Sequence, residues 1–233
     1  MAATEQLLLN LHPRTSARLG DFAAADHALL RAAMTDLLAH PASLLYLHGE
    51  PGSGRSHLLA ALCAEAQSLG LSAVLLPLAA LREEAPSLLD GLEGQDLLAL
   101  ENVDVVAGDA DWEEALFHLF NRARAAGSRL VFTAAQVPSH AGFRLPDLVS
   151  RLNLAPLWEL VLPDDAGREA MLLAAAGRRG LFMEPDLLRY LVQRGPRGSG
   201  RLLALLETLD RQSLVAGRRL TIPFVRPLLD AQE

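Results

Sequence analysis

The chain of 233 residues contains no lysine, so all 21 of its Lys and Arg positions are arginine. It contains one cysteine, Cys63, which cannot form an internal disulfide and is expected to be a buried thiol in a reducing cytoplasm. No apolar run approaches the roughly 18 residues of a membrane span. The first residues lack the basic start and apolar stretch of a secretory signal, and no His, Cys and acidic residues have metal-ligand spacing. These absences predict a cytoplasmic protein without a membrane segment or a structural metal.

The formal net charge of −7 argues against a general nucleic-acid-binding protein, because such binding depends on excess positive charge. The charge is unevenly distributed. Up to Leu162 there are 10 arginines and 19 acidic residues, whereas from Pro163 onward there are 11 arginines and 9 acidic residues. The pattern of apolar residues changes at the same place. We therefore predict a flexible tail at 1–18, a large domain at 19–162 and a small domain at 163–233.

The stretch 44–59, LLYLHGEPGSGRSHLL, places a glycine-rich loop between an apolar strand and a helix. Its spacing matches the phosphate-binding pattern G-x-x-x-x-G-K-[ST], with Arg55 in the lysine position. Glycines allow backbone N–H groups to turn towards a phosphate, and the helix N-terminus adds positive potential. The residues predicted to surround the phosphates are Gly49, Pro51, Gly52, Ser53, Gly54, Arg55, Ser56 and His57. A structural glycine turn is the alternative.

Arg55 itself has two explanations. The first is that the lysine-free composition of the chain replaced a phosphate-loop lysine without changing its function. The second is that arginine alters the site, because lysine is a compact point charge and arginine a broader planar fork. We expect such a fork to hold a diphosphate well and to position a γ-phosphate poorly. The sequence leaves both explanations open.

The apolar stretch 96–102 ends in Glu101, at the position where phosphate-loop enzymes hold Mg²⁺ with an acid. Ser56 would be the second protein ligand of the metal. Asn102 follows where these enzymes often carry the acid that activates water, and an amide cannot accept a proton. The sequence therefore predicts weak or no ATP hydrolysis by the chain itself. A plain buried strand that ends at a turn is the alternative.

Apolar strands alternate with helices up to residue 162, which predicts a parallel sheet with its ligand at the strand ends. The expected strands are 44–47, 73–78, 96–102, 129–133 and 157–162, and Thr133 would face the phosphate site. A helix is expected at 111–126, with Asp111 as its cap, Glu114 completing a capping box and His118 on the surface. From Asp164 onward only helices are expected, at 164–179, 184–193, 200–216 and 223–231. The predicted fold class is α/β, a phosphate-loop parallel-sheet αβα domain followed by a small helical lid.

The first 16 residues contain the stretch QLLLNL at 6–11. Gln6, Leu7, Leu9 and Leu11 provide one amide and several apolar anchors, a common form of short docking peptide. Exposed apolar clusters of this kind tend to mark contacts with partners. The alternative is a first strand or helix that packs on its own domain.

Together these motifs make the chain resemble the AAA+ proteins related to the bacterial replication initiator DnaA, and most closely the Hda family. The resemblance runs nearly end to end. It is carried by GEPGSGRSHLL at 49–59, LLALENVDVVAGDADW at 97–112, LFHLFNR at 116–122, LPDLVSRL at 145–152 and LTIPFV at 220–225. The combination of Arg55 with LENV favours Hda over the initiator. The chain also reaches residue 233 without room for the initiator's DNA-binding domain.

The resemblance implies roles for individual residues. Arg151 matches the family's arginine finger, and Arg201 matches the second sensor arginine, which reaches the nucleotide from the lid. The expected cofactor is ADP, or ATP, together with Mg²⁺ at Ser56 and Glu101. The peptide formed by Gln6, Leu7, Leu9 and Leu11 matches the family's site for the sliding clamp, the β subunit of DNA polymerase III. Two positions depart from the family pattern: Asn10 stands where that peptide often has proline, and Ala135 stands where relatives often have an acidic residue.

The function implied by the resemblance is negative regulation of replication initiation. An ADP-bound chain, expected to be a homodimer, would sit on the sliding clamp and stimulate ATP hydrolysis by DnaA in trans, meeting DNA only through these partners. Two rival functions stay open. One is a DnaA-type or helicase-loader ATPase that hydrolyses its own ATP. The other is a nucleotide-stabilised scaffold without a catalytic effect.

Overall fold

Five parallel strands form the sheet of the larger unit in the computed structural model, which describes residues 28–230. The strands are β1 (Leu44–His48), β2 (Ala73–Pro77), β3 (Leu97–Glu101), β4 (Arg129–Ala134) and β5 (Leu157–Glu159). Their order is β2-β3-β4-β1-β5, and every pairing is parallel. The predicted parallel sheet is confirmed. Its central strands are continuous apolar runs because both faces of a parallel sheet are covered.

The last strand is shorter than the predicted 157–162. β5 pairs with β1 alone, and the pairing ends where Glu159 lies opposite His48. His48 is the last residue of β1, since the chain turns there into the glycine loop. Beyond this point Val161 is exposed. The edge strand therefore ends because its single neighbour ends.

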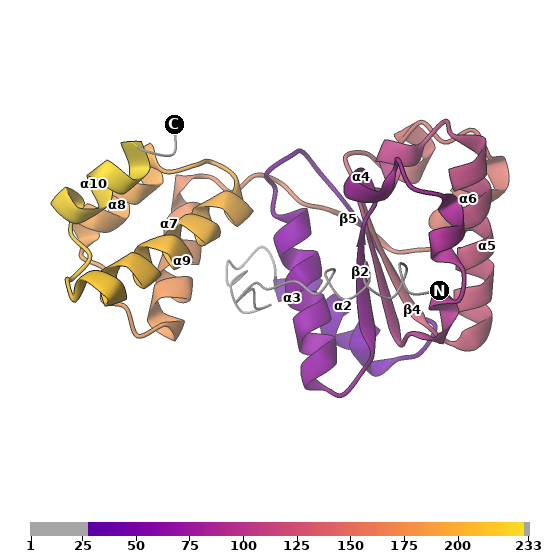
Figure 1. Ribbon diagram of the computed structural model, residues 1–233, viewed down its shortest axis with the longest axis horizontal. Helices are drawn as coiled ribbons and strands as arrows, with labels where there is room; N and C mark the ends of the chain where they lie inside the picture. The colour runs from indigo at the N-terminus through magenta and orange to yellow at the C-terminus, as the bar shows by residue number, and fades with distance from the viewer. Residues whose placement is uncertain (1–27, 231–233) are drawn as a thin grey trace. The chain divides into compact units, whose positions relative to one another are not determined.

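Helices cover both faces of the sheet, with α3 on one face and α5 and α6 on the other (Figure 1). The helical elements of this unit are α2 (Ala28–Ala39), α3 (Arg55–Ser68), α4 (Leu78–Leu81), α5 (Ala110–Ala126) and α6 (Pro146–Leu152), with 3₁₀ turns η3 (Pro86–Leu89), η4 (Leu92–Gly94), η5 (Val103–Val106) and η6 (Pro138–His140). Cys63 is buried in α3, and burial raises the pKa of its thiol to about 12. The prediction of an unpaired, buried thiol is confirmed.

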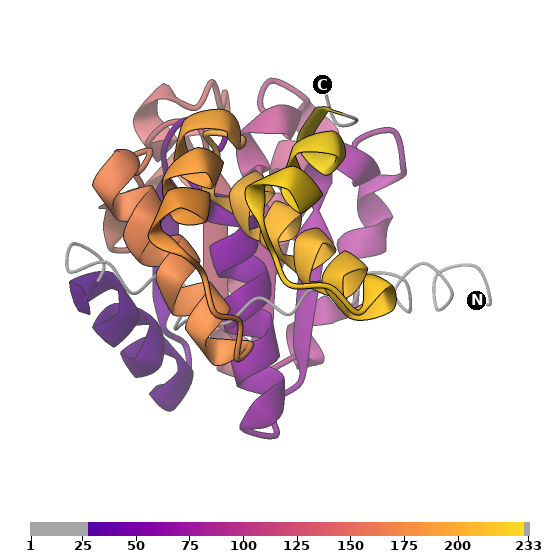
Figure 2. The ribbon, with the colours of Figure 1, turned by 90° about the vertical axis from the view of Figure 1, so that its left-hand side faces the viewer.

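The smaller unit consists of helices and loops between Val161 and Asp230, orange to yellow in Figure 2. Its helices are α7 (Asp165–Arg178), α8 (Pro185–Arg194), α9 (Ser199–Ala216) and α10 (Ile222–Asp230). They enclose a core of their own that includes Leu172, Leu187, Leu206 and Val225. By their contacts, residues 29–50 and 55–160 form one unit, and residues 28, 51–54 and 161–230 form the other. Within 28–230, no helix is long and apolar enough to cross a membrane.

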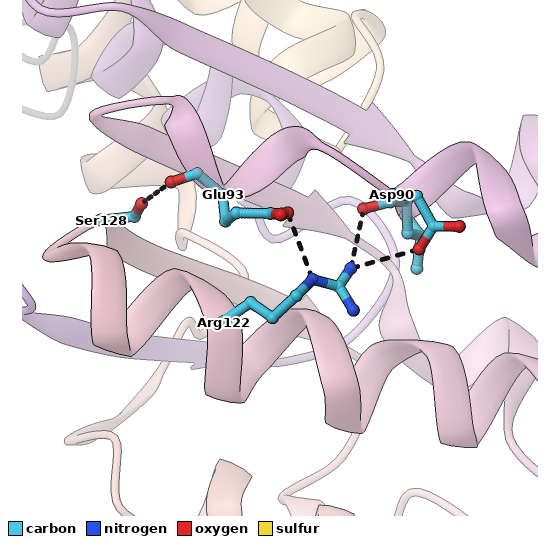
Figure 3. Close-up of polar contacts among 5 residues, drawn as sticks. Asp90, Glu93, Arg122 and Ser128 are labelled. Carbon is cyan, nitrogen blue, oxygen red and sulfur yellow. Dashed lines mark hydrogen bonds and ion pairs between the residues drawn. The ribbon is translucent and has the colours of Figure 1, made fainter.

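The segment between β2 and β3 is anchored to α5 by a polar group around Arg122 (Figure 3). The Arg122 guanidinium lies 3.3 Å from carboxylate oxygens of both Asp90 and Glu93. The Ser128 hydroxyl donates to the backbone carbonyl of Glu93 over 2.9 Å. The backbone N–H of Glu93 itself, and then the Arg122 guanidinium, lower the pKa of the Glu93 carboxyl. Arg122, part of the motif LFHLFNR, thus stabilises the fold at this place.

The predicted start of α5 is wrong by one residue, and its predicted cap is wrong by two. The cap is Asp109, whose backbone is extended and whose carboxylate accepts hydrogen bonds from the N–H groups of Asp111 and Trp112. Asp111 lies inside the first turn, so its own N–H is one of the groups to be capped. Glu114 does not complete a capping box, because it lies five residues after the cap and its carboxylate is 3.5 Å from Nε2 of His118 on the exposed face. The prediction that His118 is a surface residue is confirmed.

Asp109→Ala should lower the free energy of unfolding by about 1 kcal/mol, because two N–H groups lose their acceptor. Asp111→Ala is the matched control, and should cost less because that carboxylate interacts only with the helix dipole, worth about 0.3–1 kcal/mol. Urea unfolding followed by circular dichroism measures both. An equal or larger loss in Asp111→Ala would show that Asp109 is not the cap.

Candidate functional site

The glycine loop joins the carboxyl end of β1 to the first turn of α3. Gly52 and Gly54 have φ angles of 92° and 102°, a region that side chains with a Cβ rarely adopt. Arg55 is the first residue of α3 and Ser56 the second, so both extend from the positive end of a 14-residue helix. The loop therefore has the backbone conformation and the helix that the sequence pattern predicts for phosphate binding.

Arg55 is the most unusual side chain at this place. It is 9 % exposed, and within 28–230 its guanidinium forms no hydrogen bond or ion pair. The Nη1 atom is fully buried without an acceptor, and so is the hydroxyl of Ser53 in the loop. Burial lowers the pKa of the Arg55 guanidinium, while the nearby carboxylates of Asp104 and then Glu101 oppose this shift. A buried charge without a hydrogen-bonded partner is costly, which is typical of a binding site rather than of a structural arginine.

Asp104 is a member of this group that the sequence reasoning missed. It lies in η5, the 3₁₀ turn directly after β3, and it is half-buried. Its Oδ2 accepts a hydrogen bond of 2.8 Å from the backbone N–H of Ala135, just beyond β4. Ala135 thus contributes its backbone N–H, not its side chain, to this place. Of the charges near Arg55, that of Asp104 has the largest effect on the guanidinium.

Asn102 connects the same two strands through its backbone. It has φ 54° and ψ 55°, a left-handed conformation that asparagine tolerates better than most residues. Its N–H donates to the hydroxyl of Thr133 over 2.9 Å, and Thr133 is fully buried. The Thr133 hydroxyl, predicted to face the phosphate site, therefore holds β3 to β4. Asn102 therefore suits the left-handed backbone at this position, and it stands where phosphate-loop enzymes often carry the acid that activates water.

A third hydrogen bond joins β1 to the segment after β4. The phenol of Tyr46 donates to the backbone carbonyl of Gln136 over 3.0 Å. Burial, and then the negative charge of Asp104, raise the pKa of this phenol. Tyr46 is therefore a neutral donor at neutral pH. With Asp104 and Thr133, it fixes the carboxyl ends of β1, β3 and β4 to one another.

These residues fit an anionic ligand better than an isolated metal ion. The buried hydroxyl of Ser53 and the buried Nη1 of Arg55 supply donors without acceptors. In contrast, residues 28–230 hold no cluster of three or more His, Cys, Asp or Glu side chains suited to a metal. Ser56 is exposed and Glu101 is half-buried. These two residues would hold Mg²⁺ together with phosphate and water.

The remaining predicted site residues lie elsewhere. Arg151 is exposed in the last turn of α6, and its guanidinium has no partner among the described residues. Arg201 lies on α9 in the smaller unit, where it lines a cavity of about 860 Å³ together with Arg194 and Arg226. His57 is half-buried in α3. Gln6, Leu7, Leu9 and Leu11, as well as Asn10, lie outside the residues that the structure describes.

Comparison with known proteins places the fold. Residues 165–229 match the family described as Hda, lid domain. Domain III of the replication initiation protein DnaA from Thermotoga maritima superposes with a TM-score of 0.73 at 18 % identity, covering 95 % of this chain and 98 % of that one. Residues 165–229 therefore resemble an Hda lid domain, and the chain as a whole has the fold of DnaA domain III. The predicted AAA+ architecture with a helical lid is thereby confirmed.

Two further solved structures share the fold. AMPPCP-bound DnaA from Aquifex aeolicus has a TM-score of 0.64 at 19 % identity, over 80 % of this chain and 62 % of that one. The RuvB Holliday junction branch migration motor of Thermotoga maritima has a TM-score of 0.61 at 16 % identity, over 95 % of this chain and 72 % of that one. At such identities the likeness establishes the shared fold alone.

Asp104→Ala should reduce the free energy of unfolding by about 1–3 kcal/mol, because the Ala135 N–H loses its acceptor in a half-buried place. Asp104→Asn is the matched control, since its amide oxygen can still accept this bond while the negative charge is lost. Chemical unfolding of the ligand-free protein compares the two. Equal stability of both variants would mean that the hydrogen bond to Ala135 contributes nothing.

Proposed function

We propose that this AAA+ protein is a nucleotide-bound negative regulator of replication initiation that stimulates ATP hydrolysis by DnaA in trans. The observation that carries the proposal is the geometry of Arg151. Its helix, α6, is anchored by the fully buried side chains of Leu148 and Leu152. Arg151 lies between these two leucines in the sequence, and its side chain is exposed and has no partner among the described residues. An arginine finger requires such a guanidinium, rigidly based and free to enter another protein's site.

The proposed bound nucleotide is ADP, with ATP as a possible second ligand and Mg²⁺ at Ser56 and Glu101. Support comes from the buried, unpaired donors of Arg55 and Ser53, and from the AMPPCP bound to the DnaA of similar fold. When bound, the diphosphate supplies the negative charge that a buried guanidinium requires. Asn102 provides no general base, so we expect little hydrolysis by the chain itself. Arg201 is proposed as the lid arginine that contacts the nucleotide.

The proposed chemistry takes place in the site of the partner. Negative charge develops on the γ-phosphate oxygens as ATP is hydrolysed, and a guanidinium placed there stabilises that charge. In other phosphoryl-transfer systems such an arginine accelerates hydrolysis by about 10³- to 10⁵-fold. DnaA left with ADP would then be inactive for initiation. In this proposal Arg151 contributes charge and position, and no proton passes through it.

Recruitment is the second part of the proposal. Gln6, Leu7, Leu9 and Leu11 are proposed to dock on the sliding clamp, so that the protein acts where a clamp is loaded on DNA. The net charge of −7 agrees with contact to DNA through partners rather than directly. A homodimer is proposed as the form that binds the clamp. These elements rest on the sequence and its resemblance to the Hda family.

Arg151→Ala should lower the stimulated rate of ATP hydrolysis by DnaA by about 10³-fold or to the unstimulated level, as expected for loss of an arginine finger. The assay contains purified DnaA with ATP, clamp-loaded DNA, ADP and this protein. Arg82→Ala is the matched control, because Arg82 is an exposed arginine of the same unit whose contact is a surface ion pair with Glu83. That control should stimulate like the unchanged protein.

The outcomes separate the three candidate functions. Equal stimulation by Arg151→Ala and Arg82→Ala would show that Arg151 is not the finger. Hydrolysis of ATP by this protein alone would favour a helicase-loader type of ATPase. The double variant Gln6→Ala, Leu7→Ala should lose the part of the stimulation that depends on the clamp and keep ADP binding. A nucleotide-stabilised scaffold would show no effect of Arg151 on DnaA.

Arg55→Lys should shift the nucleotide preference from ADP towards ATP, because a point charge suits a γ-phosphate better than a planar fork does. Arg55→Ala should abolish the stabilisation by either nucleotide, which is about 2.7 kcal/mol at a ligand concentration of 100 Kd. Thermal unfolding with Mg²⁺ and a titration of ADP or ATP measures both. An unchanged ADP-to-ATP ratio in Arg55→Lys would favour the explanation by lysine-free composition.

A further inference from the structure

Glu113 is a buried carboxylate outside the residues of the proposed function. It lies in the first turns of α5 and is 1 % exposed. Charged residues are almost never buried to this degree unless they are paired or hydrogen-bonded. Among the residues described, no arginine or histidine forms an ion pair with it. The buried charge must therefore be stabilised by other donors.

Those donors are backbone N–H groups from two loops. The N–H of Gly108 donates to Oε1 over 2.6 Å. The N–H of Arg144 lies 3.0 Å from Oε1 and 2.9 Å from Oε2, and the N–H of Leu145 donates to Oε2 over 2.6 Å. Hydrogen bonds to an ionised acceptor are about twice as strong as neutral ones. One carboxylate thus joins the start of α5 to a loop 31 and 32 residues further along the chain.

The loop held in this way is the one that leads into α6. Leu145 is the residue that precedes the helix, and it has no side-chain cap. α6 is only seven residues long, so the position of its first turn determines the direction of the whole helix. A cavity of about 430 Å³ lies beside this joint, lined by Glu113, Phe117, Leu145 and neighbouring residues. The side chains of Leu145, Leu148 and Leu152 pack on the core, and on the side of the cavity the hydrogen bonds of Glu113 hold the backbone at 144–145.

We propose that Glu113 is the positioning residue for Arg151: its carboxylate fixes the backbone at 144–145 and so the direction of α6 and of the guanidinium at its end. This inference rests on the proposed role of Arg151. Glu113 itself touches no nucleotide and acts through the helix. The cost of a misplaced catalytic group is steep, since a shift of about 1 Å can lower a rate by about 10²-fold.

The test is Glu113→Gln, which keeps the shape but turns an amide NH₂ group towards the backbone N–H donors. The stimulated rate of ATP hydrolysis by DnaA at saturating regulator should fall by about 10- to 100-fold. The regulator concentration for half-maximal stimulation should change by less than about threefold, because the docking surfaces are intact. Glu114→Gln is the matched control, since Glu114 is the adjacent, exposed carboxylate. That control should match the unchanged protein in both quantities.

A double variant separates positioning from general loss of structure. In the Arg151→Ala background, Glu113→Gln should have no further effect on the stimulated rate, because it acts only through that arginine. Hydrogen–deuterium exchange of the intact protein should be faster in peptides that cover 144–152, with ADP-dependent thermal stabilisation retained. If Glu113→Gln loses that stabilisation, Glu113→Asp is used instead, which keeps the charge on a shorter side chain.

Two failures are distinguishable. If Arg151→Ala still stimulates, the proposed function fails before Glu113 is tested. If Arg151→Ala is inactive while Glu113→Gln stays folded and stimulates within about twofold of Glu114→Gln, only the positioning role is overturned. A further loss caused by Glu113→Gln in the Arg151→Ala background would also overturn it.

Discussion

The parallel pairing of β3, β4 and β1 is the constraint on which the candidate site depends. Neighbouring parallel strands end at the same edge of a sheet, so residues far apart in sequence meet there. Tyr46, Asn102 and Asp104 each hydrogen-bond to Thr133 or to the backbone just beyond β4. These bonds hold the three strand ends in register. Arg55 begins α3, the helix that follows β1 and the glycine loop. Its guanidinium is therefore close enough to Asp104 and Glu101 to be affected by their charges.

The buried arginines of this lysine-free chain differ in what they bind. Arg129 donates to the carbonyls of Leu37 and Leu38 at the end of α2 and to that of Asp96. Arg168 donates to Asp165 and to the carbonyls of Gly195 and Pro196. Both use the planar fork as a clamp for several acceptors, which a lysine could not do equally well. Arg55 is as buried as these two but has no hydrogen-bond acceptor within 28–230. Its missing acceptors point to a ligand.

The sequence predicted the elements well because hydrophobic period and glycine placement are local signals. It predicted the parallel sheet for the same reason. It did not find Asp104, because nothing local says whether an acid in a 3₁₀ turn faces the site or the solvent. It predicted Asp111 as the cap of α5, whereas Asp109 is the cap; two acids two residues apart fit this position almost equally. Glu113 was missed because its partners lie about thirty residues away, and a glutamate on an amphipathic helix is usually exposed.

The two carboxylates that the sequence did not reveal act on one segment. Asp104 holds the N–H of Ala135, where the chain leaves β4, and Glu113 holds the N–H groups of Arg144 and Leu145, where it enters α6. The connection between the end of β4 and α6 is therefore fixed at both ends by charge-assisted hydrogen bonds. The helix that carries Arg151 packs on α5, and its Leu148 and Leu152 belong to a core cluster that also contains residues of β1, β3 and β4. The position of Arg151 thus depends on hydrogen bonds within the larger unit. Under the proposed function, a variant would lose stimulation of DnaA while its own nucleotide loop stays intact.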